Sequence, residues 1–299
     1  SSDSHERSTY TALGSFGGSI GYNGITVVVI PIVTYFSWVF TGEHAESQSG
    51  WTCFGIIVGL LGLLTAWTVA FGTKENESAL RSKAQENGNP IEAFKAIFQN
   101  DQLLWVALSY LLYAIANVAT TGVLIFLFKF ILDNQAAYSL TGVIALVAGL
   151  VMAPLYPILN KRIPRRYLYL GGMISMIAGY VMLGIFSDNI IMVFVALVLF
   201  YVPGTLIQMT AILSLTDSIE YGQLKNGKRN EAVTLSVRPM LDKIGGAMSN
   251  GIVGIIAVAA GMTGNATAAD MTASNIHIFK ICAFYIPLVL IILSLIVFL

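Results

Sequence analysis

Charge is scarce in this sequence. Only 11% of its 299 residues are Asp, Glu, Lys or Arg, and the 16 basic and 16 acidic side chains cancel to a net charge of zero. Without an excess of positive charge there is no electrostatic basis for binding nucleic acid, so we expect no such partner. By contrast, 56% of the residues are hydrophobic. Because a soluble domain does not need so much apolar surface, we predict an all-α membrane protein that contacts the lipid bilayer.

Cysteine and histidine are also rare, and motifs for catalysis are missing. Cys53 and Cys282 lie far apart in apolar segments, which indicates buried thiols without a disulfide or metal. His5, His44 and His277 do not have the spacing of metal ligands. The sequence also lacks a nucleophile with a nearby base, a Gly-rich phosphate loop and a nucleotide-binding fingerprint. We therefore expect neither a cofactor, nor a metal site, nor an enzyme.

Apolar segments of membrane-spanning length fill most of the chain. Each is near or above the ~20 residues that cross the hydrocarbon core as a helix. Aromatic residues within them, such as Tyr110 and Tyr113, are interpreted as interfacial and packing residues. The expected segments are 15–40, 51–71, 102–131, 136–159, 167–186, 190–216, 233–261 and 275–299.

The basic residues between these segments predict the orientation of the chain. Twelve of the 16 Lys and Arg residues lie in the opening stretch and in loops 72–101, 160–166 and 217–232, whereas the alternate loops have none. By the positive-inside rule, the chain crosses the membrane eight times with both ends in the cytoplasm. The other four cations lie within apolar segments; Lys129 and Lys280 are interpreted as snorkelling to an interface.

Loop 72–101 is the one long hydrophilic connection, with two helices before it and six after it. Six helices after a long cytoplasmic loop are typical of the second half of a twelve-helix carrier. We therefore predict that residues 1–71 form the last two helices of an N-terminal bundle, and that residues 102–299 form a C-terminal bundle. The polar opening without Met and the apolar end lead us to expect a fragment without the first four helices.

The stretch 216–251 contains nine of the 32 charged residues between two apolar segments. Arg238 and Asp242 are four residues apart, so they can pair along one helix face. Lys243 is turned about 100° from Asp242 and lies roughly 15 Å into its segment, too deep for easy snorkelling. An ionised group at such a depth is usually functional, and we predict that Lys243 faces a polar cavity.

Charges at the cytoplasmic helix ends suggest a gate. The short turn 159–166, LNKRIPRR, includes Arg162 and three further cations. Asp217 and Glu220 are suitable partners because they share a helix face at i and i+3. Arg7 lies at the same membrane surface and could reach Glu220. Solvated loop charges and topology anchors are the alternative interpretation. Exposed ion pairs are weak singly, but several that break together can bias two states.

With these residues in place, the chain resembles the glycoside–pentoside–hexuronide:cation symporters, a branch of the major facilitator superfamily, and within it the bacterial lactose/galactoside permeases. The strings that carry the resemblance are SDSHERSTYTALGSFGGSIG, APLYPILNKRIPRR and LTDSIEYGQLKNGKRNEAVTLSVRPMLDKIGGAMSNGIVG. It covers the whole chain, from the loop before the family's fifth helix to its twelfth helix. The implied fold is a major facilitator-type helical bundle.

The resemblance also assigns roles to individual residues. It implies that the loop and helix after IEYG take part in sugar binding and cation coupling, that other polar residues face the sugar cavity, and that the gate charges match those of the family. The coupling role falls on Lys225, Lys228, Glu231 and Lys243; the cavity positions are Gln208, Arg238 and Asp242; the gate charges are Arg7, Asp217 and Glu220.

These observations lead us to expect part of a secondary transporter in a bacterial plasma membrane. It would move a galactoside such as lactose with H+ or Na+, or in exchange for galactose, by alternating access. A phosphotransferase-type regulatory domain in the full-length protein is a further expected partner. The alternatives are a carrier of another glycoside, such as a pentoside, glucuronide or raffinose-type sugar, and a membrane sensor that binds sugar without moving it.

Overall fold

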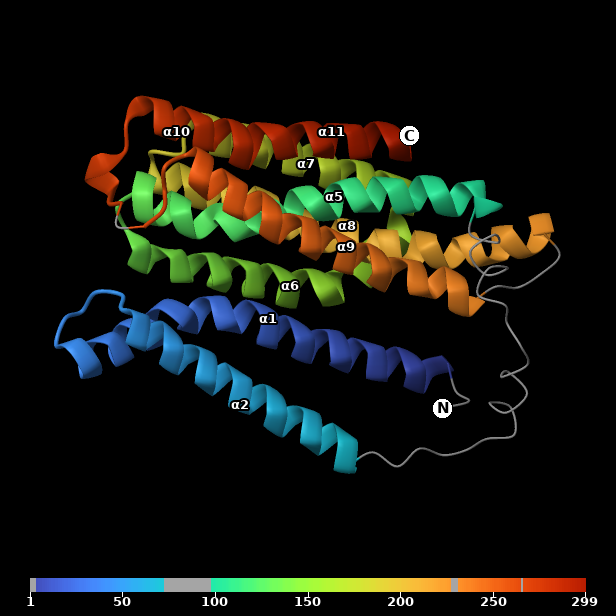
Figure 1. The fold of residues 1–299 in the computed structure, drawn as a ribbon. Helices are drawn as coiled ribbons and strands as arrows, with labels where there is room; N and C mark the ends of the chain where they lie inside the picture. Colours follow the sequence, from blue (N-terminus) through green and yellow to red (C-terminus); the bar gives the residue numbers. More distant parts are fainter. Residues whose placement is uncertain (1–3, 73–97, 227–230, 265) are drawn as a thin grey trace.

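The structure is a computed structural model that describes residues 4–72, 98–226, 231–264 and 266–299, with the side chains of 4–16, 19, 22, 23, 226 and 231–235 outside the description. Its long helices run back and forth side by side (Figure 1). Among the described residues, eight helical segments are long and apolar enough to cross a membrane, which confirms the predicted number of crossings. The chain is thus a multi-pass helical membrane protein.

Most of the spans are single α-helices, whereas the third and the last include a π-helical turn. The third span continues through the π-helical turn η1 (Leu127–Ile131). The last span joins α10 (Ala273–Lys280), the π-helical turn η4 (Ile281–Tyr285) and α11 (Ile286–Phe298). The others are α1 (Ser4–Thr41), α2 (Gln48–Gly72), α5 (Asp101–Phe126), α6 (Ser139–Arg162), α7 (Arg165–Ile185), α8 (Ile190–Asn226) and α9 (Glu231–Ala259); short helices η2 (Gln135–Tyr138) and η3 (Ala268–Asp270) lie in loops.

Helix α8 is ten residues longer than predicted. The charge density of 217–232 indicated a loop, but the helix continues through Asn226, so that prediction was wrong. The physical reason is a buried stripe of Leu215, Ser218, Ile219 and Gly222. These residues recur at the helical spacing i, i+3, i+4 and i+7, and they bury one face of the extension while its charges point outward. Helix α1 likewise starts before the predicted residue 15, at Ser4.

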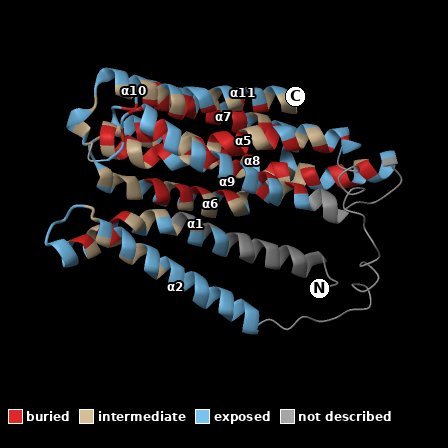
Figure 2. Ribbon diagram, viewed as in Figure 1, coloured by how far each residue is buried: buried red, intermediate tan, exposed pale blue. Residues whose placement is uncertain are grey.

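The core of the molecule lies among α5, α7, α8, α9 and α11. The largest cluster of buried residues lies on these helices, whereas α2 is exposed over most of its length (Figure 2). Buried polar side chains join the helices at fixed points: the hydroxyls of Ser109 on α5 and Ser294 on α11 each donate to the other's backbone carbonyl, at 2.9 and 2.7 Å. Such small polar residues hold membrane helices together where lipid offers no competing partner.

Helices α1 and α2 form a hairpin that packs on the other six spans through α1 and α6. The hairpin is tight because Gly50 leaves room for the α1 backbone; a Cβ on Gly50 would lie 2.5 Å from the Val33 carbonyl oxygen. At the turn between the two helices, the Ser47 backbone N–H donates to the Ser37 hydroxyl at 2.9 Å. The same turn reaches η1, where Lys129 Nζ lies 3.7 Å from Glu46 Oε2.

Candidate functional site

The charges predicted to pair inside the membrane do lie side by side. Arg238 Nε is 3.8 Å from Asp242 Oδ2, one turn apart on α9. The side chains are about one-third and two-fifths exposed, so neither is sealed in the core. Arg238 Nε is itself a buried atom without a hydrogen-bond partner among the described residues. An unused buried donor beside a carboxylate is suited to binding a polar ligand.

A third residue, Tyr110 on α5, completes this cluster. Its hydroxyl donates to Asp242 Oδ1 at 2.7 Å, and the tyrosine is only 1% exposed. Hydrogen bonds to an ionised oxygen are short and strong, so the bond fixes the carboxylate against α5. The sequence offered no signal for it, because Tyr110 looked like one of many packing aromatics. We call Tyr110, Arg238 and Asp242 the polar triad.

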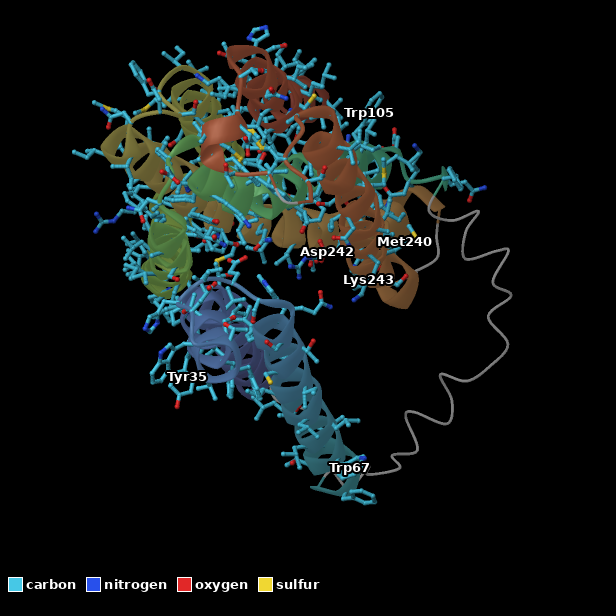
Figure 3. All side chains as sticks on the ribbon, turned by 60° about the vertical axis from the view of Figure 1, so that its left-hand side comes forward. Tyr35, Trp67, Trp105, Met240, Asp242 and Lys243 are labelled. Atoms are coloured by element: carbon cyan, nitrogen blue, oxygen red, sulfur yellow. The ribbon has the colours of Figure 1, made fainter. Side chains whose placement is uncertain are left out.

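Lys243 on α9 and Gln208 on α8 are both exposed, and their roles in coupling and in the sugar cavity stay predictions. Figure 3 shows Asp242 and Lys243 on the edge of the six-span part that faces α1 and α2, whereas Trp105 lies on another side. Among the described side chains, no acid lies within ion-pair distance of Lys243. Gln208 follows the buried Ile207 on α8. The polar cavity expected around Lys243 stays a prediction.

The basic turn between α6 and α7 makes an ion pair with α8, through a different arginine from the one singled out. Arg165 pairs with Asp217, whereas Arg162 is exposed at the end of α6. In the described part of the chain, no cation lies within ion-pair distance of Glu220. Both members of the observed pair are at least one-third exposed, so its contribution to stability is about 1 kcal/mol or less.

Lys225, expected to act in coupling, pairs with an acid that sequence reasoning missed. Its Nζ lies 2.8 Å from Asp101 Oδ1, at the first residue of α5. This contact places the end of α8 beside the start of α5, as the positions of both helix ends in Figure 1 show.

Three predicted residues lie wholly or partly outside the described part of the chain. Arg7 belongs to α1 and Glu231 is the first residue of α9, but their side chains are not described. Lys228 lies within 227–230 and is not described at all. The proposed contact of Arg7 with Glu220 and the coupling roles of Lys228 and Glu231 therefore stay predictions. Among the described residues, no three His, Cys, Asp or Glu side chains gather as metal ligands.

Comparison with known proteins gives matches over the full chain. The family model described as "MFS/sugar transport protein" matches residues 1–299. A lactose permease of Leuconostoc lactis is 51% identical over 299 residues, and one of Lactobacillus helveticus is 46% identical over 298 residues. A raffinose carrier protein of Pediococcus pentosaceus is 36% identical over 296 residues. The matches cover 99–100% of this chain but only 46% of each relative, so the chain spans about half their length.

Proposed function

The chain belongs to the family of MFS sugar transport proteins, and on that premise we propose that it is part of a secondary carrier for galactosides such as lactose. The permease names of the Leuconostoc lactis and Lactobacillus helveticus relatives support this choice of sugar. The raffinose carrier makes a larger galactoside the second candidate. The predicted arrangement, with residues 1–71 and 102–299 in different halves of the carrier, is part of the same proposal.

The observation that carries the proposal is the polar triad within the membrane. A carboxylate within a membrane-spanning segment is costly, and such a residue usually has a function. Here the Asp242 carboxylate accepts a hydrogen bond from the Tyr110 hydroxyl and lies near the Arg238 guanidinium. Asp242 can accept hydrogen bonds from two sugar hydroxyls, and Arg238 can donate to a sugar oxygen. Lys243, one residue on, is an exposed cation at the same level of α9.

Transport follows from alternating access around these residues. The substrate-bound carrier reorients between two states, and a co-transported H+ or Na+, or galactose on the return step, supplies the coupling. The positive-inside pattern supports a plasma membrane location with both ends of this chain in the cytoplasm. A phosphotransferase-type domain in the complete protein is a proposed regulatory partner.

The test is counterflow in vesicles that contain the complete protein. Vesicles loaded with unlabelled lactose are diluted into labelled lactose, without a gradient and then with a pH or a Na+ gradient. We expect transient accumulation of label, and faster uptake with the gradient of the coupling ion. Loading with galactose tests exchange. Saturable binding without accumulation of label would instead support a sensor and would overturn the proposal.

Replacing the triad carboxylate separates specific from general effects. Asp242→Asn keeps the shape of the side chain but removes the charge, and we expect it to lower the initial rate of counterflow at least about tenfold, equivalent to roughly 1.4 kcal/mol. Asp188, in the loop that follows α7, is the matched control; Asp188→Asn leaves the triad untouched and is expected to keep the rate.

A further inference from the structure

The junction between the start of α5 and the end of α8 is built around a buried amide. Asn100 is only 3% exposed although it lies at a helix terminus. Its Oδ1 accepts a hydrogen bond from the Leu103 backbone N–H at 3.0 Å and so caps α5. Its Nδ2 donates across to the Ser218 carbonyl of α8 at 2.7 Å. One side chain thus both starts α5 and holds α8.

Gly222 makes this contact possible. A Cβ at this position would lie 2.7 Å from Asn100 Nδ2, closer than real Cβ atoms come to a neighbour. The Asn100 amide therefore occupies the space that a larger residue would need one turn after Ser218. Close approach, rather than backbone flexibility, is the reason for glycine here, since Gly222 still lies within helix α8, before its last residue Asn226, and does not have a positive φ.

The next turn of α8 adds an ion pair to this amide contact. Lys225 Nζ lies 2.8 Å from Asp101 Oδ1 and 5.7 Å from the ring centre of Tyr221. Both charged side chains are about half exposed, so the pair alone is weak. The position of this ion pair matters more than its strength. Together with the hydrogen bond from Asn100 to Ser218, it gives α8 two contacts with the start of α5, and two contacts fix the rotation of α8 as well as its distance from α5.

We propose that Asn100 and Asp101 are positioning residues, which hold the charged end of α8 so that the connection to α9 leaves at a fixed place. This rests on the proposed function. Lys225 then contributes to transport through Asp101, not by touching sugar or cation. Two members of the polar triad, Arg238 and Asp242, lie on α9, the helix that this connection enters. A displaced α8 end therefore slows reorientation without changing the groups that bind sugar.

The consequence is a split between rate and affinity. A residue that contacts the sugar changes the apparent KM when it is replaced, whereas a residue that sets the orientation of an element changes the maximal rate. Asp101→Lys places two cations face to face, and we expect the maximal rate of lactose counterflow to fall about tenfold, with the apparent KM unchanged within roughly twofold. Combining Asp101→Lys with Lys225→Asp restores the pair, and we expect it to recover most of the rate.

A second variant tests the buried amide. Asn100→Asp retains a good helix cap but replaces the Nδ2 donor with an oxygen that faces the Ser218 carbonyl. We expect a similar loss of rate, together with faster hydrogen–deuterium exchange of residues 216–226. Gln102→Lys is the control, because it adds a cation at the neighbouring exposed position of α5; it is expected to change neither rate nor exchange.

The outcomes distinguish the two proposals. If the wild-type protein exchanges lactose and both variants match it in rate, the positioning role is overturned and the proposed function stands. The positioning role is also overturned if Asp101→Lys raises the apparent KM for lactose, or if the double variant Asp101→Lys/Lys225→Asp fails to restore the rate. Lys225 then touches the substrate or cation directly. If the wild-type protein does not exchange lactose, the proposed function falls, and the role in transport falls with it. The rate of hydrogen–deuterium exchange of residues 216–226 in the Asn100→Asp variant then still decides whether the Asn100 amide holds α8.

Discussion

The bond between Tyr110 and Asp242 joins the two helices that contribute the polar triad. Without it, the carboxylate would be oriented only by Arg238, whose nearest distance of 3.8 Å is too long for a hydrogen bond. The two neighbours contact different oxygens of the carboxylate: the Tyr110 hydroxyl on α5 binds Oδ1, and Arg238 lies near Oδ2. The orientation of Asp242 is therefore set by a residue that carries no charge itself.

Removing this hydroxyl should weaken sugar binding rather than folding. Tyr110→Phe keeps the buried ring and deletes only the donor to Asp242. Because one hydrogen bond to a charged group is worth about 1.5–3 kcal/mol and water can replace part of it, we expect the apparent KM for lactose counterflow to rise roughly 3–30-fold. The measurement is the initial rate over a range of lactose concentrations in vesicles.

The matched control for this substitution is Tyr180→Phe. Tyr180 is equally buried, and its hydroxyl donates to the Ala116 carbonyl of α5 at 3.0 Å, away from the triad. It should lower thermal stability in detergent and leave KM unchanged. Equal KM values for both variants and the wild type would show that Asp242 does not need Tyr110 to bind sugar.

Sequence reasoning found the pair within one helix, whereas between helices it predicted only that the turn 159–166 meets Asp217, not which arginine does so. Arg238 and Asp242 were predicted because a spacing of four residues fixes their distance. Asp101 and Tyr110 were not, because their partners come from α8 and α9, and the rotation of one helix against another is not written in local spacing. Arg165 rather than Arg162 reaches Asp217 for the same reason.

At the scale of elements, hydropathy predicted the spans well but not their continuations. The apolar windows predicted eight helices correctly, because lipid requires ~20 apolar residues whatever surrounds them. The extension of α8 beyond residue 216 is polar, and its one buried face is narrow, so it resembles a loop to any test of average composition. The π-helical turns η1 and η4 are likewise invisible in the sequence, since their extra residue per turn follows from packing.

Contact between α7 and α8 depends on glycine at the crossing point. A Cβ on Gly179 would lie 3.1 Å from the Ala196 carbonyl oxygen and 3.3 Å from the Leu199 carbonyl carbon. Both neighbours are backbone atoms and cannot rotate away, so Gly179→Ala must push the helices apart. We expect it to destabilise the protein by about 1–3 kcal/mol, seen as a lower melting temperature in detergent.

Gly171 on the same helix is the control for this prediction. It is exposed, and a Cβ there would meet nothing within 4 Å. Gly171→Ala should be neutral or stabilise by up to ~1 kcal/mol, because alanine favours the helix. A melting temperature equally unchanged in both variants would mean that the two helices separate without cost at this point.

At the scale of the whole molecule, the α1–α2 hairpin touches the remaining spans along α6 and at one end through a polar contact. At that end, Glu46 lies between Lys129 Nζ, at 3.7 Å, and Gln135, whose side-chain amide donates to it. Glu46 is 18% exposed, more protected than the other described ion-paired acids, Asp101, Asp217 and Asp242. Lys129, which was predicted to snorkel to a membrane interface, contacts the turn of the hairpin through Glu46.

If the hairpin and the six later spans belong to different halves, this contact must open in each transport cycle. Glu46→Cys and Lys129→Cys, in a complete protein whose native cysteines, Cys53 and Cys282 among them, are replaced by Ser, can be joined by a short thiol-reactive crosslinker that reduction cleaves. We expect the crosslinked protein to lose nearly all lactose counterflow and to regain it on reduction, because a two-state carrier held in one state cannot turn over.

Either cysteine alone, treated with the same reagent, is the control and should retain exchange. The crosslink tests motion rather than binding, since neither Glu46 nor Lys129 belongs to the polar triad. The turn between α1 and α2 also lies at the opposite end of the molecule from the start of α5 and the end of α8 (Figure 1). Full counterflow in the joined protein would show that the hairpin and η1 move as one body. The moving boundary would then lie elsewhere, and the assignment of residues 1–71 and 102–299 to different halves would have to be abandoned.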